Sequence, residues 1–138
     1  MPSRLLIVDD HEIVRFGVRA LFANDDSVEV CGEAGNGMEA IRMVSELSPD
    51  VVILDLTMPG LNGFETAAKI LSIAPSVKIV FFSAHEIPAT ARTVGADDFV
   101  SKSSSLQELT IAVSRALQSS KNLQPQLKSF SATNSSER

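Results

Sequence analysis

The chain has 138 residues, of which 44% are hydrophobic and 21% charged, with a net charge of -5 and an isoelectric point near 4.9. This length and composition predict one globular domain, and the acidic balance argues against direct binding to nucleic acid, which requires a basic surface. The single cysteine, Cys31, cannot form an internal disulfide, and the first apolar run is too short for a signal peptide or membrane span, so we expect a cytoplasmic protein.

The first 50 residues predict two strands, each followed by a helix. Residues 5–8 are continuously apolar and end at acidic residues, of which Asp10 is the expected N-cap of the next helix. The apolar face of that helix is expected to consist of Ile13, Phe16, Ala20 and Leu21. Residues 28–32 alternate, as in an edge strand, and Asn36 followed by Glu39 is a capping pattern for a second helix.

Residues 51–54 form the most informative run, because four apolar side chains lead directly to the carboxylate of Asp55. A short buried helix would be equally apolar, but Val and Ile favour a strand, and Pro59 ends the segment too soon for a helix. A strand buried on both faces is typical of a parallel sheet. Asn62 and Glu65 then repeat the capping pattern before a third helix.

The rest of the chain predicts two more strands, over 77–82 and 98–100, separated by a short helix from Pro88 to Gly95. A capping box from Ser105 to Glu108 begins a last amphipathic helix. Five alternations of strand and helix predict an α/β fold with a parallel sheet and helices on both faces.

Residues 119–138 differ from the rest: they include six Ser and show little periodicity, and we expect a disordered tail. The tail carries a net charge of +2 and the whole chain -5, so the residues before the tail carry about -7. The predicted organisation is therefore a folded domain over 1–118 and a Ser-rich tail over 119–138.

Four predicted strands end in polar residues, which the alternation places at one edge of the sheet. The residues are Asp9, Asp10, Asp55, Ser83 and Lys102. Three adjacent carboxylates repel one another unless a cation joins them, and all-oxygen ligands suit Mg²⁺ or Mn²⁺. A lysine and a hydroxyl can bind phosphoryl oxygens, so the set is that of phosphoryl transfer to an aspartate. Taken singly, each residue also has an ordinary interpretation as a cap, turn or surface residue.

Two stretches, residues 5–15 and 55–63, resemble the receiver domain of response regulators in two-component signalling. The first is most similar to the subfamily that usually carries a C-terminal DNA-binding helix-turn-helix. The second, Asp-Leu-Thr-Met-Pro-Gly-Leu-Asn-Gly, resembles the family's phosphoacceptor motif at every marked position. The resemblance covers residues 4–117 and implies a flavodoxin-like (βα)5 fold with strand order 2-1-3-4-5.

The resemblance also implies a role for each candidate residue. Asp55 would accept a phosphoryl group from a histidine kinase or a histidine phosphotransfer protein. The chain would then be a phosphoprotein and not an enzyme, although it could lose the phosphoryl group by intrinsic autodephosphorylation. The implied Mg²⁺ (or Mn²⁺) ligands are Asp10, Asp55 and the Thr57 backbone carbonyl directly, and Asp9 through water. Ser83 and Lys102 would bind the phosphoryl oxygens, and Ser83 and Phe99 would be the switch residues. Thr57 and His85 would tune the lifetime of the phosphoryl group.

The output implied by the family is a changed surface on the fourth helix, fifth strand and fifth helix, read by a downstream protein partner or a phosphorylation-dependent homodimer. Three departures from the family bear on it. Lys102 follows Ser83 by only 19 positions, about one helical turn short, which predicts a shortened fourth helix. Ser103 stands where many receivers have Pro, and residues 119–138 lack the pattern of a helix-turn-helix, so we expect a single-domain receiver without direct nucleic-acid or membrane binding.

Other fold families fit the strand ends less well. A flavodoxin would need a phosphate-binding loop where Asp9 and Asp10 stand, and a haloacid-dehalogenase-type phosphatase would need a second Asp where Thr57 stands. Residues 32–37 lack the spacing of a dinucleotide-binding loop and the lysine of a P-loop. Two alternatives stay open: an inactive receiver-like protein-binding module, and the receiver part of a DNA-binding transcription regulator.

Overall fold

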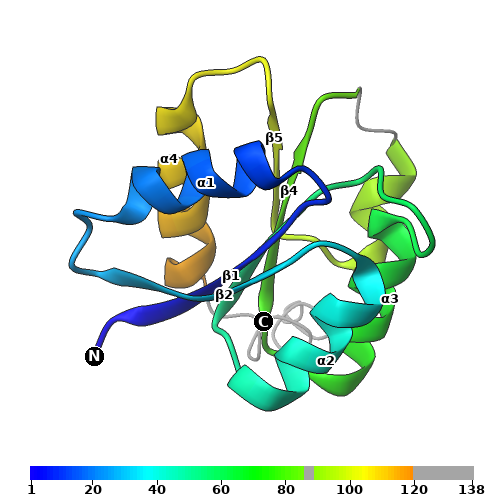
Figure 1. The fold of residues 1–138 in the computed structure, drawn as a ribbon. Helices are drawn as coiled ribbons and strands as arrows, with labels where there is room; N and C mark the ends of the chain where they lie inside the picture. The colour runs from blue at the N-terminus through cyan, green and yellow to red at the C-terminus, as the bar shows by residue number, and fades with distance from the viewer. Residues whose placement is uncertain (86–88, 120–138) are drawn as a thin grey trace, which may run out of the picture.

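The computed structural model describes residues 1–85 and 89–119, which form one parallel sheet with helices on both faces (Figure 1). The elements in chain order are β1 (Ser3–Val8), α1 (Glu12–Phe22), β2 (Val28–Ala34), α2 (Gly37–Leu47), β3 (Val51–Leu54), α3 (Gly63–Ile73), β4 (Lys78–Ser83), the 3₁₀ helix η1 (Ala89–Val94), β5 (Asp98–Ser101) and α4 (Leu106–Gln118). The sheet order is β2-β1-β3-β4-β5, which confirms the predicted topology.

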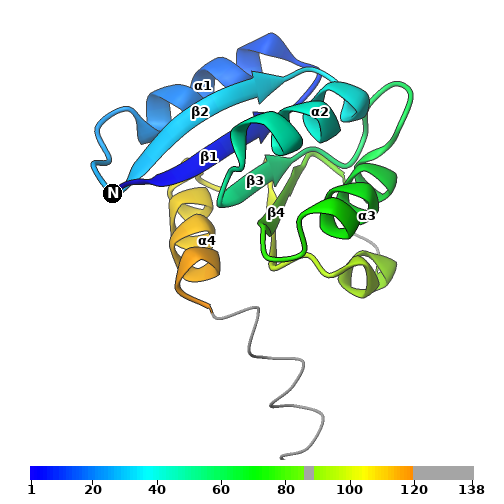
Figure 2. The ribbon, with the colours of Figure 1, turned by 90° about the horizontal axis from the view of Figure 1, so that it is seen from below.

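The helices form two layers, with α1 and α4 on one face of the sheet and α2 and α3 on the other (Figures 1 and 2). Alternate side chains of each central strand feed the two cores: Leu6 of β1 packs toward α2 and α3, and Leu5 packs toward α1 and α4. All four residues of β3 are buried, because the strand lies between β1 and β4 and is covered on both faces. This double burial explains the unalternating apolar run of β3.

Helix α1 presents a different face to the core from the one expected. Ile13 and Phe16 are 79% and 68% exposed and Ala20 is also exposed, whereas Val18 and Phe22 are buried against the sheet. Of the four predicted residues, Leu21 packs against this core. The helix contains two overlapping apolar stripes, and periodicity alone does not choose between them. The contacts that α1 makes with β2 and α4 select the stripe of Val18 and Phe22.

The helix ends correct two further expectations. The N-cap of α1 is His11 and not Asp10, because the Asp9 carboxylate accepts the His11 backbone N–H and so extends the turn by one residue. Ser105 is the N-cap of α4, but its side chain makes no capping bond: the Glu108 N–H donates to the Ser105 backbone carbonyl.

The caps of the two middle helices agree with the sequence pattern. The Asn36 side chain accepts the Glu39 N–H at the start of α2. A complete, reciprocal capping box joins Asn62 and Glu65 at the start of α3. Both helices therefore begin where their polar residues predicted.

The fourth helical segment is short, as predicted, and it is a 3₁₀ helix (η1). A 3₁₀ helix rises about 2.0 Å per residue against about 1.5 Å for an α-helix, so six residues span roughly the length of eight α-helical ones. The tighter winding therefore makes up part of the missing turn. The predicted start at Pro88 lies outside the described residues, as does the predicted tail beyond Ser119.

The end of α4 is attached to the sheet at the edge where β4 begins. The buried Lys78 side chain donates from Nζ to the Ser119 carbonyl at 2.7 Å and contacts the Ser119 hydroxyl at 3.0 Å. None of the helices in the described ranges is both long and apolar enough to cross a membrane.

Gly63, the first residue of α3, packs directly on the backbone that follows β3. Its N–H donates to the Leu56 carbonyl at 2.8 Å, and an added Cβ would lie 2.6 Å from the Leu56 Cα and in contact with the Asp55 carbonyl oxygen. The close approach of α3 to the end of β3 therefore requires glycine at this position.

We expect Gly63→Ala to lower the free energy of unfolding by about 1–3 kcal/mol, because backbone atoms must move to admit the methyl group. Urea denaturation measures the change. Gly17→Ala is the matched control: a Cβ added there, in the middle of α1, would meet no atom within 4 Å apart from the backbone of its own helix and its chain neighbours, so it should stabilise by up to about 1 kcal/mol. Equal destabilisation by both substitutions would show that Gly63 has no special packing role.

Candidate functional site

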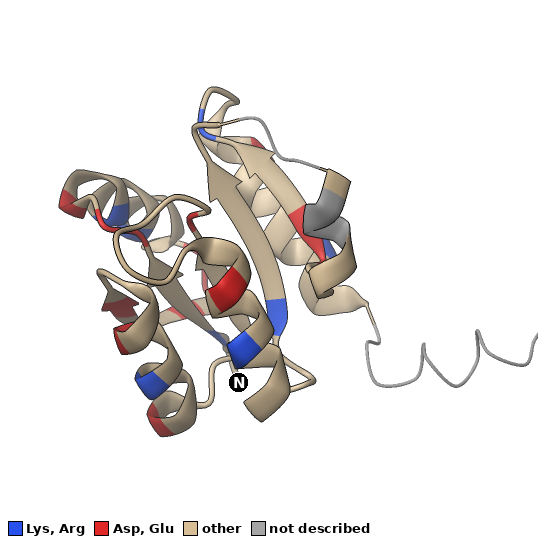
Figure 3. Ribbon diagram, turned by 90° about the vertical axis from the view of Figure 1, so that its right-hand side faces the viewer, with Lys and Arg blue, Asp and Glu red and all other residues tan. Residues whose placement is uncertain are grey.

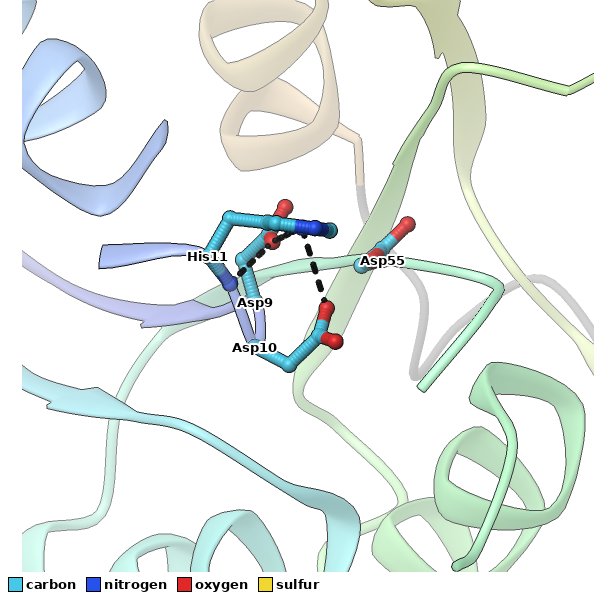
Figure 4. A group of neighbouring side chains, drawn as sticks. All are labelled: Asp9, Asp10, His11 and Asp55. Atoms are coloured by element: carbon cyan, nitrogen blue, oxygen red, sulfur yellow. Dashed lines mark hydrogen bonds and ion pairs between the residues drawn. The ribbon is translucent and has the colours of Figure 1, made fainter. Parts of the chain in front are cut away.

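The topology brings the predicted site residues to one edge of the sheet, where the central strands end. Asp9 and Asp10 follow β1, and Asp55 follows the adjacent β3. The Asp55 N–H donates to the Val8 carbonyl at 3.0 Å, which continues the β1–β3 pairing to the base of the site. Figure 4 shows the three aspartates side by side at these two strand ends.

The three aspartates and His11 offer ligand atoms that all lie within 4.8 Å of one another. Asp9 and Asp55 are only 2% and 3% exposed, so their charges are largely removed from water. Oδ1 of Asp10 is buried and has no hydrogen-bond partner in the described part of the chain. Buried oxygens of one sign at this spacing are costly unless a cation or proton joins them.

Lys102 supplies the positive charge nearest to this cluster among the described ion pairs. Its Nζ lies 2.6 Å from Asp9 Oδ2 and 3.5 Å from Asp55 Oδ1, and its side chain is 16% exposed. The Lys102 backbone N–H donates to the Ser83 carbonyl at 2.8 Å, so the ends of β4 and β5 are also joined. One lysine thus bridges the ends of β1 and β3 from the last strand of the sheet.

Of the remaining predicted residues, Thr57 and His85 line an open hollow of about 420 Å³ above the carboxylates. Asp10, Asp55 and Lys102 also line it. The hollow is large enough for a phosphoryl group with its waters, and it opens onto the Asp55 carboxylate.

Ser83 and Phe99 are not among the residues that line the hollow. Ser83 is fully buried, and its hydroxyl oxygen accepts the His85 backbone N–H at 3.1 Å. Phe99 is half-buried and stacks on Phe81 with ring centroids 5.9 Å apart, in a register that pairs the same two residues across β4 and β5. Both residues have contacts that would have to change in a switch.

Burial raises the pKa of Asp55 above its ordinary value, and the neighbouring charge of Asp9 raises it further. Lys102 and the Thr57 N–H oppose this rise, because each favours the ionised carboxylate. The ionised Asp55 is therefore held in a site that disfavours its charge, which is the condition that a bound cation relieves.

The donor set fits a hard divalent cation. The group combines three carboxylates from adjacent loops with a buried Asp10 oxygen that has no hydrogen-bond partner among the described residues. Oxygen ligands of this kind suit Mg²⁺ or Mn²⁺, which retain waters that can give way to phosphoryl oxygens. The residues that would hold the ion are Asp9, Asp10, Asp55 and the Thr57 carbonyl.

Two groups at this edge were not singled out from the sequence. The His11 ring Nδ1 lies 3.2 Å from Oδ1 of both Asp9 and Asp10, but hydrogen-bond geometry is met only with Asp9. Arg15 donates to the Asp9 carbonyl from α1. An imidazole directly after an acid pair was a visible signal for His11, whereas the role of Arg15 depends on the rotation of α1, which periodicity did not settle.

Comparison with known proteins places these residues in a known family. Residues 5–114 match the family described as "Response regulator receiver domain". The chain is 34% identical over 127 residues to the response regulator GacA of Pseudomonas viridiflava, and 38% identical over 118 residues to the nitrate/nitrite response regulator protein NarL of Escherichia coli. The alignments cover 90% and 83% of this chain but only 59% and 55% of those relatives, so the chain spans little more than half their length.

Two solved structures match this chain over a larger share of their own length. A LuxR-family response regulator from Aurantimonas superimposes with a TM-score of 0.80 at 37% identity, covering 85% of this chain and 86% of that one. The receiver domain of a NarL-type regulator from Mycobacterium tuberculosis gives a TM-score of 0.80 at 34% identity and covers 86% of this chain and 98% of that one.

The raised pKa of Asp55 predicts how the metal-free protein responds to substitution. When the pKa of a carboxyl is higher in the folded than in the unfolded state, the free energy of unfolding of the protein falls as the pH rises through the unfolded-state pKa. The loss is complete above the folded-state pKa and persists at higher pH. In EDTA at pH 7 we therefore expect Asp55→Asn to melt above the wild type, by about 4 °C for each ~1 kcal/mol relieved. The difference should vanish below the ordinary carboxyl pKa.

Thermal denaturation followed by circular dichroism from pH 3 to pH 8 measures both curves. Asp26→Asn, which removes an exposed carboxylate outside the cluster, is the control and should follow the wild type. A metal-free Asp55→Asn protein that melts below the wild type at pH 7 would mean that the ion pair with Lys102 outweighs the cost of burial.

Proposed function

Because the chain belongs to the response regulator receiver family, we propose that it is a phosphoacceptor in a two-component phosphorelay, with Asp55 as the acceptor. The observation that carries the proposal is the position of Asp55: a buried carboxylate, at the end of the central strand β3, that faces an open hollow beside two further carboxylates and a lysine. The phosphoryl donor would be a histidine kinase or a histidine phosphotransfer protein.

The proposed reaction needs only one covalent step at the protein. An oxygen of the ionised Asp55 attacks the phosphorus in line, the bond from phosphorus to the donor's histidine nitrogen breaks, and that nitrogen keeps the electron pair. The product is an acyl phosphate on Asp55. Lys102 lies 3.5 Å from the attacking carboxylate and would balance the charge of the transferred group.

A divalent cation at this site would supply charge neutralisation on the phosphoryl oxygens. The buried Asp10 oxygen and the carboxylates of Asp9 and Asp55 would hold the ion, and the Thr57 carbonyl would complete the protein ligands. The chain itself is the substrate of the transfer. Hydrolysis of the acyl phosphate would return it to the starting state.

The proposed output uses residues that now have other contacts. A phosphoryl group on Asp55 would compete for Lys102, which is paired with Asp9, and for the Ser83 hydroxyl, which accepts the His85 N–H. Movement of Ser83 would affect β4 and, through the stacked rings of Phe81 and Phe99, β5. The surface formed by η1, β5 and α4 is therefore the proposed output surface, for a protein partner or a second copy of the chain.

The same site also fits the receiver segment of a transcription regulator, and the relatives' greater length favours keeping this second candidate. Among the structural neighbours, RcsB from Salmonella enterica, 28% identical, was solved bound to a promoter with the phosphomimetic BeF₃⁻. In both cases Asp55 has the same role, and the candidates differ only in what responds to its phosphorylation: a separate protein partner or a DNA-binding part of the same regulator. The net charge of the chain is -5, and along the ribbon in Figure 3 the acidic positions are interspersed with basic ones, so we propose protein contacts as the direct output.

Incubation with acetyl phosphate and Mg²⁺ should add one phosphoryl group to the wild type and none to Asp55→Asn, because Asp55 is the buried carboxylate of the cluster that lines the hollow, whereas Asp9 does not line it and Asp10 is only partly buried. Intact-mass spectrometry measures the label. Asp10→Asn should reduce labelling strongly, and EDTA should abolish it in the wild type. Equal labelling of wild type and Asp55→Asn would refute the assignment, and no labelling at all would favour the inactive binding module.

Addition of BeF₃⁻ with Mg²⁺ should change hydrogen exchange at the end of β4, in β5 and in α4, because the phosphoryl mimic draws on Ser83 and Lys102. Exchange mass spectrometry with and without the mimic reports the change. Asp55→Asn is the control and should not respond. Changes restricted to the loops that carry the three aspartates would show that the signal does not reach the output surface.

A further inference from the structure

The backbone that carries the acidic pair is held from outside the site by one arginine. Arg15, on the first turns of α1, donates from Nη1 to the carbonyl oxygen of Asp9 at 2.6 Å. That carbonyl belongs to the peptide that joins Asp9 to Asp10. The Asp9 N–H donates in turn to the Ala34 carbonyl at the end of β2, at 3.1 Å, so the residue is fixed at both of its backbone polar groups.

Arg15 is itself fixed by Glu33, near the end of β2. Arg15 Nε donates to Glu33 Oε1 at 3.0 Å, and the second carboxylate oxygen, Oε2, pairs with Arg19. Burial raises the pKa of Glu33, but the hydrogen bonds from Arg19 and Arg15 outweigh burial and lower it overall. The Arg15 side chain is only 18% exposed, so the pair is shielded from much of the solvent.

The two carboxylates depend on this backbone to different degrees. The Asp9 carboxylate is held directly, by the His11 N–H at 2.9 Å and by Lys102 at 2.6 Å. Oδ1 of Asp10 has no hydrogen-bond partner in the described structure, and its one described side-chain contact is with Nδ1 of the exposed His11 ring at 3.2 Å, so the orientation of that side chain depends largely on the peptide that precedes it. The Arg15 bond fixes the plane of that peptide.

We propose that Arg15, anchored by Glu33, is a positioning residue that aims the Asp10 carboxylate at the cation site. This inference rests on the proposed function, because it assumes that the three aspartates bind a divalent cation. Arg15 contacts neither Asp55 nor the Asp10 side chain in any described hydrogen bond or ion pair, and it would act only through the Asp9–Asp10 peptide.

The direction of the effect separates positioning from simple electrostatics. Removing a positive charge close to three carboxylates should strengthen the binding of a cation if charge alone matters. Removing a group that orients a ligand should weaken it. A loss of affinity on removal of Arg15 therefore cannot come from its charge.

The test is Mn²⁺ binding, measured by the electron paramagnetic resonance signal of free Mn²⁺ in titrations of the 138-residue chain. We expect Arg15→Gln to raise the Kd at least about tenfold, as is typical when a group that orients a metal ligand is removed. Arg19→Gln is the matched control, because it also removes a guanidinium paired with Glu33 but makes no described contact with the Asp9 carbonyl. Its Kd should stay the same or fall.

Arg15→Lys keeps the charge but lacks the fork that reaches Glu33 and the Asp9 carbonyl together, so it should also raise the Kd, and it provides the measurement if Arg15→Gln does not fold. At saturating Mn²⁺, both variants should still be labelled at Asp55 by acetyl phosphate. Wild-type affinity in both Arg15 variants, or equal weakening in Arg19→Gln, would overturn the inference alone. A wild type that binds no Mn²⁺ would overturn the proposed cation site together with it.

Discussion

The gathering of three carboxylates, two of them buried, at the ends of two adjacent strands is the constraint on which this structure depends. Asp9 and Asp55 are almost fully removed from water, and their mutual repulsion opposes folding. Lys102 reaches across from the end of β5 to offset part of this cost. The sheet order that brings β1 beside β3 is therefore also the order that concentrates the charge.

The same constraint explains why the surrounding backbone is so closely held. The Asp55 strand end is fixed by β1 on one side and by Gly63 of α3 on the other, and the Asp9 strand end is fixed by β2 and Arg15. Like charges would move apart if their loops were free to do so. The close packing of the backbone segments holds the carboxylates together against their electrostatic repulsion.

Much of the fold and the membership of the acidic cluster could be predicted from the sequence, because both depend on local patterns. The unalternating run before Asp55 indicated a doubly covered strand, and alternation of strand and helix placed the strand ends at one edge. The rotation of α1 was not predicted correctly, because Ile13 and Val18 belong to two overlapping apolar stripes and the packing against the sheet decides between them. Arg15 was missed for the same reason, since its contact with Asp9 follows from that rotation.

The attachment of Ser119 to Lys78 has a practical consequence for work with the protein. Lys78 begins β4 and the acidic cluster lies at the opposite ends of the strands, about 20 Å away at roughly 3.3 Å per residue over the six residues of β4. Ser119 therefore lies at the end of the sheet opposite the acidic cluster. A dye or carrier attached at residue 119 would lie away from the hollow, so immobilising the protein there would leave the hollow, the face that we propose a phosphoryl donor approaches, pointing outward.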